Sequence, residues 1–345
     1  MIRLLIVEDL EIYQKILFEI FSKDPEIEIV GIAKNGKEAV ELAKKLKPHV
    51  ITMDIHMPVM DGKEATQRIM EENPVPIVVV SSSYSGQETE KAFEILSLGA
   101  VGILPKPAPT LDNFEKEAKE LLEGVKNYSQ SRIIRRKNIS KIFSKPKLKE
   151  IPKVEWIAIG SSTGGIPVLE TILSALPSSF HLSLFIVQHM AKGFQDGFLS
   201  WLQEKVKLKI KIPKEGEIPE KGTIYFPPED YHLCLNEKGS FVLSMEKREN
   251  SFRPSVSYLF RSLVPFGEKV AACLLSGMGE DGAKEMVDLK KAGAATIAQS
   301  PESAVIFGMP KKAIEYGGVD HILNPKEIIH FFLKLDQKFS ERTSL

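Results

Sequence analysis

The chain has 345 residues, of which 43% are hydrophobic, 27% charged and 8% aromatic, a composition typical of globular proteins rather than of disordered or fibrous ones. Its length predicts roughly two domains. The two cysteines, Cys234 and Cys273, lack the spacing of a zinc site or a redox pair, and no apolar run approaches the ~20 residues of a membrane-spanning helix. The first residues lead into a strand-like segment rather than a signal peptide. We therefore expect a cytoplasmic protein without disulfides or membrane insertion.

The net charge of zero conceals regions of different charge. Residues 1–125 carry 14 Lys and Arg against 22 Asp and Glu, whereas residues 126–150 carry nine against one. The basic stretch has weak apolar periodicity, so we interpret residues 123–152 as a linker between domains at 1–122 and 153–345. Nucleic-acid binding by this linker is the alternative interpretation. Because the sequence lacks base-stacking aromatics and a recognisable DNA-binding motif there, we expect no nucleic-acid partner.

Short β-branched runs alternate with amphipathic helical stretches in the first third of the chain. Helices are predicted at residues 11–22 and 37–46, where apolar side chains recur at helical spacing. The predicted strands are residues 2–7, 28–33, 50–53, 77–80 and 100–104. This alternation predicts a (βα)5 domain with a parallel, flavodoxin-like sheet, in which functional residues gather at the carboxyl ends of the strands.

Polar side chains follow four of these predicted strands: Glu8 and Asp9 the first, Asp54 the third, Ser81 the fourth and Lys106 the fifth. Taken singly, each acid also suits a helix N-cap or an exposed surface position. Together, three carboxylates in one pocket repel one another, and a hard cation such as Mg²⁺, which prefers oxygen ligands, would neutralise them. The joint pattern predicts that Asp54 accepts a phosphoryl group, whose oxygens the metal ion and Lys106 would screen.

These residues resemble the receiver domain of response regulators over residues 1–122. The matching motifs are Glu8-Asp9, Met53-Asp54-Ile55-His56-Met57-Pro58-Val59-Met60-Asp61-Gly62, Ser81 and Lys106-Pro107. The resemblance implies that Glu8, Asp9 and Asp54 bind Mg²⁺ together with the main-chain carbonyl of His56. It also implies that Ser81 and Lys106 form the phosphoryl-sensing switch. Two positions depart from the pattern: Glu8, where Asp is commoner, and Ile103, where many receivers carry a switching aromatic.

After the linker, an apolar run at residues 154–159 leads into Gly160-Ser161-Ser162-Thr163-Gly164-Gly165 and then into a helical stretch at 167–176. A strand, a tight turn and a helix form the context expected of the G-x-S-x-G pattern of serine nucleophiles. We therefore expect Ser162 to be exposed on the turn, near helix N-terminal amides that would stabilise negative charge. A glycine-rich turn that binds phosphate is the alternative, although the run matches neither G-x-G-x-x-G nor Walker A.

A serine nucleophile needs a base, which is in turn oriented by a third group. Residues 182–188 form a strand-like run that ends at His189, and residues 270–275 form another that leads to a glycine-rich turn containing Asp281. Ser162, His189 and Asp281 could meet above one sheet, in a chain order that differs from that of α/β-hydrolases. His232, at the start of a predicted strand, is a rival base for which a structural or rim role is favoured. The remaining candidates, His181, His321 and His330, are expected at the surface or in packing.

Six motifs in this region resemble the catalytic domain of the chemotaxis-type protein-glutamate methylesterases, the CheB family, over about residues 153–335. They are Ile159-Gly160-Ser161-Ser162-Thr163-Gly164-Gly165, Gln188-His189-Met190, Arg253-Pro254-Ser255-Val256, Gly277-Met278-Gly279-Glu280-Asp281-Gly282-Ala283, Ala298-Gln299 and Phe307-Gly308-Met309-Pro310. The resemblance implies a doubly wound, mainly parallel α/β domain with Ser162, His189 and Asp281 as its catalytic triad. It places Thr163 in the active site and the main-chain amide of Met278 in the oxyanion hole. Phe252 stands where some members have His, and Ser257 where Asp is common.

Together the two resemblances imply a phosphorylation-regulated hydrolase that removes methyl esters from glutamyl residues of chemoreceptors, releases methanol and deamidates receptor glutamines. The chemotaxis histidine kinase would donate the phosphoryl group to Asp54. Mg²⁺ would serve this phosphorylation, and the esterase chemistry would need no cofactor. A different class stays open, namely a phosphorylation-dependent regulator whose second domain only binds partners.

Overall fold

The structure is a computed structural model of the whole chain, and it describes residues 1–81, 86–108, 113–131, 153–250 and 252–343. Contacts divide the chain into two compact units, Met1–Arg135 with Gly193–Trp201 and Arg136–Lys192 with Leu202–Leu345, and each is described by itself. Most of the predicted basic linker, at residues 132–152, lies outside the described residues, so the domain boundaries stay predictions. No helix in the described ranges is both long and apolar enough to span a membrane.

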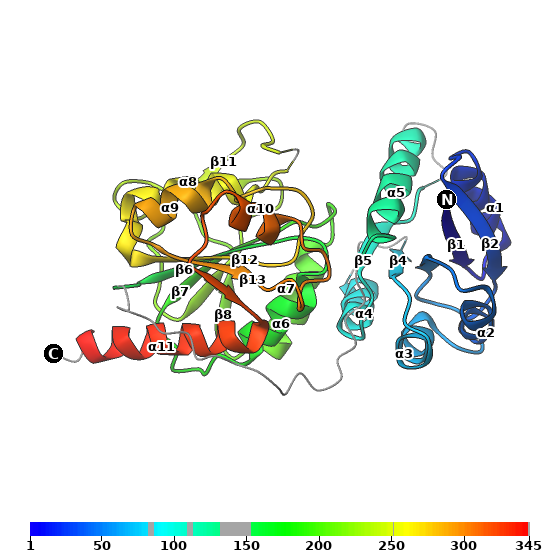
Figure 1. Cartoon of the computed structure of the whole chain (residues 1–345), viewed down its shortest axis with the longest axis horizontal. Helices are drawn as coiled ribbons and strands as arrows, with labels where there is room; N and C mark the ends of the chain where they lie inside the picture. Colours follow the sequence, from blue (N-terminus) through cyan, green and yellow to red (C-terminus); the bar gives the residue numbers. More distant parts are fainter. Residues whose placement is uncertain (82–85, 109–112, 132–152, 251, 344–345) are drawn as a thin grey trace. The chain divides into compact units, whose positions relative to one another are not determined.

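The first unit contains a five-stranded parallel sheet with strand order β2-β1-β3-β4-β5 (Figure 1). Its strands are β1 (Ile2–Val7), β2 (Ile27–Ala33), β3 (Val50–Met53), β4 (Ile77–Ser81) and β5 (Gly102–Pro105). The helices that follow them are α1 (Glu11–Ser22), α2 (Gly36–Leu46), α3 (Gly62–Glu72), α4 (Gly86–Ser97) and α5 (Phe114–Tyr128). The predicted (βα)5 architecture is thus confirmed.

Side-chain caps and turns set where these elements begin. The Asn35 side chain accepts a hydrogen bond from the Glu38 amide at 3.0 Å and caps α2. Strand β5 starts at Gly102, two residues later than predicted. The reason is that Gly99, at φ 120°, turns the chain out of α4, and the Ala100 amide still donates to the Ile95 carbonyl of that helix.

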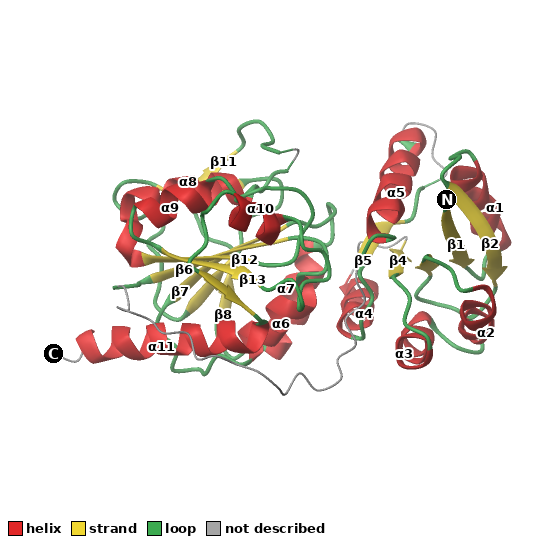
Figure 2. Cartoon of the chain, viewed as in Figure 1, coloured by secondary structure: helices red, strands yellow, loops and turns green. Residues whose placement is uncertain are grey.

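The second unit is built on a seven-stranded sheet of order β14-β13-β12-β6-β7-β9-β8, in which every neighbouring pair is parallel. Its strands are β6 (Trp156–Ser161), β7 (Ser183–Gln188), β8 (Lys209–Lys211), β9 (Thr223–Tyr225), β12 (Val270–Leu274), β13 (Ala295–Gln299) and β14 (His321–Leu323), and an antiparallel hairpin adds β10 (His232–Leu235) and β11 (Phe241–Ser244). The helices are α6 (Ile166–Ser174), α8 (Val256–Leu263), η1 (Val264–Lys269), α9 (Glu285–Lys291), α10 (Met309–Glu315) and α11 (Pro325–Thr343). Helix α7 (Gln195–Lys205) belongs to the first unit up to Trp201 and to the second from Leu202. Figure 2 shows α8, α9 and α10 on one face of this sheet and α6 and α11 on the other, so the doubly wound α/β prediction is confirmed.

The strand order of the second sheet reverses at β6, because β7 lies on one side of it and β12 on the other. In doubly wound sheets, such a switch point opens a crevice at the carboxyl ends of the strands, where ligands bind. The segments after β6, β7 and β12 carry Ser162, His189 and Asp281, respectively. The topology therefore brings the three predicted catalytic residues to one edge of the sheet.

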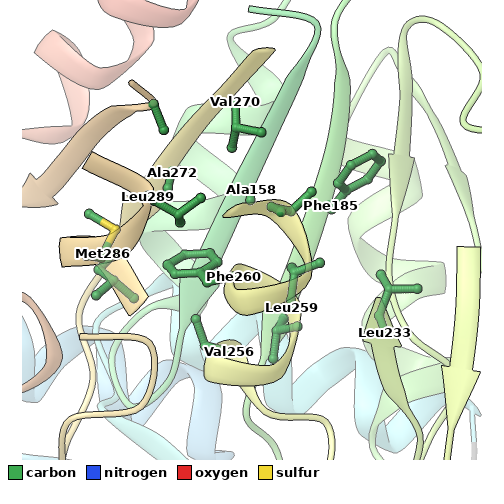
Figure 3. Close-up of a cluster of buried hydrophobic side chains, with 14 of the residues drawn as sticks. Ala158, Phe185, Leu233, Val256, Leu259, Phe260, Val270, Ala272, Met286 and Leu289 are labelled. Atoms are coloured by element: carbon green, nitrogen blue, oxygen red, sulfur yellow. The ribbon is translucent and has the colours of Figure 1, made fainter. Parts of the chain in front are cut away.

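Helix α8 is held against the sheet by apolar packing. Leu259 and Phe260 of this helix are fully buried in one cluster with Ala158 of β6 and Phe185 of β7 (Figure 3). Val256, in the first turn of α8, lies so close to Gly160 that a Cβ at Gly160 would be 2.4 Å from its Cγ1. The packing thus fixes the amino end of α8 at the carboxyl edge of the sheet, beside the predicted active site.

Candidate active site and phosphorylation site

The three acidic side chains predicted to hold a metal ion lie together at the carboxyl edge of the first sheet. Carboxylate oxygens of Glu8, Asp9 and Asp54 all lie within 4.8 Å of one another. Glu8 is buried, whereas Asp9 and Asp54 are half-buried. A close set of oxygen donors that still admits water is what Mg²⁺ requires, so the residues present fit the predicted ion.

The ammonium group of Lys106 lies among these acids, with Nζ 2.7 Å from Glu8 Oε2 and 3.2 Å from Asp54 Oδ2. Burial, together with the charge of Asp54, raises the pKa of Glu8 to about 6 despite the hydrogen bond from Lys106. Burial also raises the pKa of Asp54, although Lys106 opposes this shift. Burial disfavours the charge on Lys106, yet Asp54 and Glu8 raise its pKa. One ammonium does not offset the crowded carboxylates, and the pocket favours a further cation.

Ser81 and His56 also lie on this edge of the first sheet. Ser81 is the buried last residue of β4, and its carbonyl accepts a hydrogen bond from the Lys106 amide at 2.7 Å. The His56 side chain is half-exposed and places Nε2 3.8 Å from Glu88 Oε1. The metal-binding role of the His56 carbonyl and the switch role of Ser81 stay predictions.

In the second unit, Ser162 occupies the turn between β6 and α6. Its amide donates to the Ser276 carbonyl at 3.0 Å, and its carbonyl accepts from the Gly165 amide at 2.9 Å. The expectation that Ser162 is exposed is wrong, because only 7% of its surface is accessible. The segment after β12 lies against it: a Cβ at Gly277 would be 2.8 Å from the Cβ of Ser162. The serine is therefore a buried residue of the crevice rather than a projecting one.

Replacing Gly277 with alanine is expected to lower kcat by about 100-fold, because small displacements of a reacting group cost rates of that order. The new Cβ would lie 2.8 Å from Ser162 Cβ and 2.3 Å from Met309 Sδ, so both contacts must be relieved, by movement of Met309 together with Ser162 or of the Gly277 backbone itself. Steady-state ester hydrolysis, combined with circular dichroism to verify folding, measures this effect. An unchanged kcat would mean that the Gly277 backbone moves away and that Ser162 keeps its position.

His189 and Asp281 form a buried pair at the same edge, with His189 Nε2 2.9 Å from Asp281 Oδ2 and both side chains at most 4% exposed. Because Nε2 is engaged with the carboxylate, Nδ1 is the nitrogen left to accept a proton, and within the described chain it is buried without a hydrogen-bond partner. Gln188 Nε2 links the turn after β6 to the end of β7, because it donates to the carbonyls of Ser162 and His189 at 3.1 and 2.8 Å. No hydrogen bond joins Ser162 to His189 among the described contacts, and such catalytic contacts often tighten only when substrate binds.

The carboxylate of Asp281 accepts hydrogen bonds on both oxygens from its surroundings. Besides His189, the donors are Asn250 Nδ2 at 3.0 Å, Ser255 Oγ at 2.8 Å, the Val256 amide at 2.7 Å and the Ser257 amide at 3.0 Å. Burial disfavours the charge, but the hydrogen bond and charge of His189, with those further donors, hold the pKa of Asp281 well below its usual range. Asp281 therefore stays ionised, as the acid of a triad must.

Thr163 and Met278 flank this arrangement. The Thr163 carbonyl accepts a hydrogen bond from Ser276 Oγ at 2.8 Å, which ties the turn after β6 to the segment after β12. The main-chain N–H of Met278 has no acceptor among the residues that the structure describes. This amide follows Gly277, which lies against Ser162, and a role for it in stabilising an oxyanion stays a prediction.

His232, the alternative candidate for the base, has a structural role. It is fully buried and its Nδ1 accepts the Ser255 amide at 3.2 Å, while Nε2 lies 3.2 Å from the Lys247 carbonyl. Its ring stacks on Tyr258 with centroids 4.1 Å apart. Burial lowers the pKa of His232, which keeps the ring neutral. Both nitrogens are thus occupied, and His232 supports the backbone that in turn holds Asp281.

Two residues that contact Asp281 were missed by the reasoning from sequence. Ser255 lies in the quoted motif Arg253-Pro254-Ser255-Val256, which was a usable signal. Asn250 lies outside every quoted motif, so the sequence gives no signal for its contact with Asp281. Its contact with Asp281 arises only when the segment before α8 folds back over the sheet edge.

Comparisons with known proteins match both parts of the chain to described families. The family model described as CheB methylesterase matches residues 157–332, and that of the response regulator receiver domain matches residues 4–117. The protein-glutamate methylesterase/protein-glutamine glutaminase 1 of Syntrophus aciditrophicus is 40% identical over 97% of this chain and 98% of its own length. A namesake from Geobacter metallireducens is 42% identical over 95% of this chain and 97% of its own. The crystal structure of the Thermotoga maritima CheB methylesterase catalytic domain matches 53% of this chain and 98% of that chain, with 34% identity and a TM-score of 0.51. The combination of a receiver model, a methylesterase model and near full-length relatives means that this chain belongs to the CheB family of response-regulator methylesterases.

Proposed function

We propose that this chain is a cytoplasmic, phosphorylation-regulated hydrolase that removes methyl groups from glutamyl residues of chemoreceptors and deamidates receptor glutamines during chemotaxis adaptation. The observation that carries the proposal is the buried His189–Asp281 pair: His189 Nδ1 has no hydrogen-bond partner among the described residues, and Gln188 links the carbonyls of Ser162 and His189. The names of the relatives include both activities and support the choice of substrate.

In the proposed reaction, His189 Nδ1 takes the proton of Ser162 Oγ while Oγ attacks the ester carbonyl carbon. The oxygen of the tetrahedral intermediate accepts a hydrogen bond from the Met278 amide. The bond to the methoxy oxygen then breaks, Nδ1–H protonates that oxygen, and methanol leaves. Water, deprotonated by Nδ1, attacks the acyl carbon, the bond from that carbon to Ser162 Oγ breaks, and Nδ1–H returns the proton to Oγ as the glutamate carboxylate leaves. With a glutamine substrate, ammonia leaves in place of methanol.

Asp281 supports each of these proton transfers. It accepts the Nε2–H of His189 and thereby leaves the lone pair of the imidazole on Nδ1. It also stabilises the imidazolium that forms transiently, because it remains a carboxylate.

In the receiver, Asp54 is the proposed phosphoryl acceptor. Its carboxylate oxygen attacks the phosphorus of a phosphohistidine on the chemotaxis kinase, and the bond from phosphorus to nitrogen breaks. Glu8, Asp9 and Asp54, with the His56 carbonyl, would hold Mg²⁺, which screens the negative charge when bound. Lys106, already 3.2 Å from Asp54, and the Ser81 hydroxyl would contact the phosphoryl oxygens.

The partners of this function are the methylated receptors and the kinase, and neither nucleic acid nor membrane insertion takes part in it. Methanol release from methylated receptor membranes, measured with and without a small phosphodonor such as acetyl phosphate, tests the proposal. We expect release that increases with the phosphodonor. Absence of both methanol release and fluorophosphonate labelling of Ser162 would instead support a regulator whose second domain only binds partners.

Asp54→Asn is expected to remove the increase caused by the phosphodonor and to leave the basal rate of methanol release unchanged. The asparagine cannot accept a phosphoryl group, while Ser162, His189 and Asp281 belong to a different sheet. The basal rate and the ratio of rates with and without phosphodonor are the two readouts. A basal rate that falls with the ratio would point to a structural role of Asp54.

A further inference from the structure

The segment that precedes α8 makes a tight turn beside the catalytic pair. Glu249 and Phe252 exchange main-chain hydrogen bonds, with the Glu249 amide 3.0 Å from the Phe252 carbonyl and the Phe252 amide 2.8 Å from the Glu249 carbonyl. Paired hydrogen bonds of this kind close the backbone on itself. The side chains of Asn250 and Phe252 are therefore presented in fixed directions.

These two side chains contact the two ends of the catalytic pair. The ring of Phe252 lies parallel to the imidazole of His189, at 7° and with 3.7 Å between the ring centroids. On the same turn, Asn250 Nδ2 donates to Asp281 Oδ1 at 3.0 Å and lies 3.3 Å from Ser257 Oγ. One short turn thus contacts both the base and the acid.

Ion pairs hold the turn on both sides. At the start of the turn, the Glu249 carboxylate pairs with Arg261, whose guanidinium also lies 3.1 Å from Glu285 Oε1. After it, the Arg253 guanidinium makes a two-point contact with Asp230, at 3.0 and 2.9 Å. Bidentate pairs fix geometry more firmly than single contacts do. The turn is therefore anchored to α8 and α9 at one end and to the segment before β10 at the other.

We propose that Phe252 and Asn250 are positioning residues for the hydrolase reaction. Phe252 confines the imidazole of His189 to one plane, so that Nε2 stays on Asp281 and Nδ1 stays available to Ser162. Its π face also stabilises the imidazolium formed while Ser162 attacks. Asn250 holds the other end of the pair by keeping the Asp281 carboxylate oriented. The inference rests on the proposed function, because it names the residues that orient its base and acid.

Phe252→Leu keeps apolar volume but removes the flat ring, and it is expected to lower kcat about 10-fold with little change in KM, since the ring contacts the base rather than the ester. Phe252→Tyr retains the ring and is expected to keep kcat within about twofold of the parent. Asn250→Ala is expected to lower kcat severalfold, because Asp281 keeps its other donors. Phe266→Leu, which disturbs an edge-to-face contact with Trp156 at the opposite end of β6, is the matched control and should leave kcat unchanged.

Methanol release by the full chain with phosphodonor measures kcat and KM, and the imidazole N–H resonance of His189 reports on its bond to Asp281. We expect that resonance to be sharp in the parent and in Phe252→Tyr, and to broaden by exchange in Phe252→Leu. Equal kcat values in Phe252→Leu and the parent, or equal losses in Phe252→Leu and Phe252→Tyr, would overturn the inference. If the parent itself releases no methanol, the proposed function fails. In that case the His189 resonance still tests the positioning role, because a sharp signal in Phe252→Leu would refute that role.

Discussion

Ser162→Ala is expected to reduce methanol release by at least 10³-fold while leaving phosphorylation of Asp54 intact. Loss of one member of a Ser-His-Asp triad commonly costs that much, because the covalent route is closed and only weaker stabilisation of the transition state remains. The substitution removes one oxygen from a residue with 7% exposure and introduces no new contact, so the fold should persist. Stopped assays of methanol release, with phosphoryl incorporation as the parallel readout, measure both effects.

Ser161→Ala is the matched control for this variant. Ser161 is the last residue of β6, is fully buried, and its Oγ has no hydrogen-bond partner in the described part of the chain. Removing an unpaired buried hydroxyl is neutral or mildly stabilising, so both activity and the free energy of unfolding should stay near the parent values. If Ser161→Ala lost activity and Ser162→Ala kept it, the nucleophile would be assigned to the wrong serine.

The sequence predicted the sheets well because their signals are local. The run at residues 2–7 is apolar apart from Arg3, the run at 270–275 is apolar throughout, and a polar turn follows each. They became β1 and β12 within one residue. The short strands β8 and β9 were not predicted, since three residues carry too little periodicity to be distinguished from loops. Their pairing depends on neighbouring strands rather than on their own sequence.

Some features of the candidate site were likewise predictable from local sequence, and others were not. Family motifs located Ser162, His189 and Asp281, and the structure brings all three segments to one switch point. The burial of Ser162 was not predictable, because it depends on how closely Gly277, 115 residues further along the chain, approaches the turn. The stack of Phe252 on His189 likewise joins two segments that no local pattern relates. The members of the proposed triad were therefore predictable from sequence patterns, whereas the side chains that surround them depend on tertiary contacts.

Asp281→Asn is expected to lower kcat by about 10⁴-fold, because an asparagine side chain no longer enforces the tautomer of His189 that keeps a lone pair on Nδ1. It should also destabilise the second unit. Both oxygens of Asp281 accept hydrogen bonds, and an amide NH₂ group facing the Val256 amide and His189 Nε2 would leave buried donors unpaired, at a cost of about 1–3 kcal/mol.

The stability difference between the parent and Asp281→Asn should depend on pH in one direction. The pKa of Asp281 is depressed in the folded protein, so its ionisation stabilises the fold above the pKa of the unfolded chain, whose reference value is 3.8. That contribution is fully present at neutral pH and is lost as the pH falls below this value towards the folded pKa, whereas the asparagine variant lacks it throughout. Urea unfolding of both proteins between pH 7 and pH 3, followed by tryptophan fluorescence, should therefore show a gap in unfolding free energy that narrows as the pH falls below about 4. A gap that stayed the same at every pH would mean that the carboxylate of Asp281 gains no net stabilisation from its donors, and the loss of kcat would then have to come from the orientation of His189 alone.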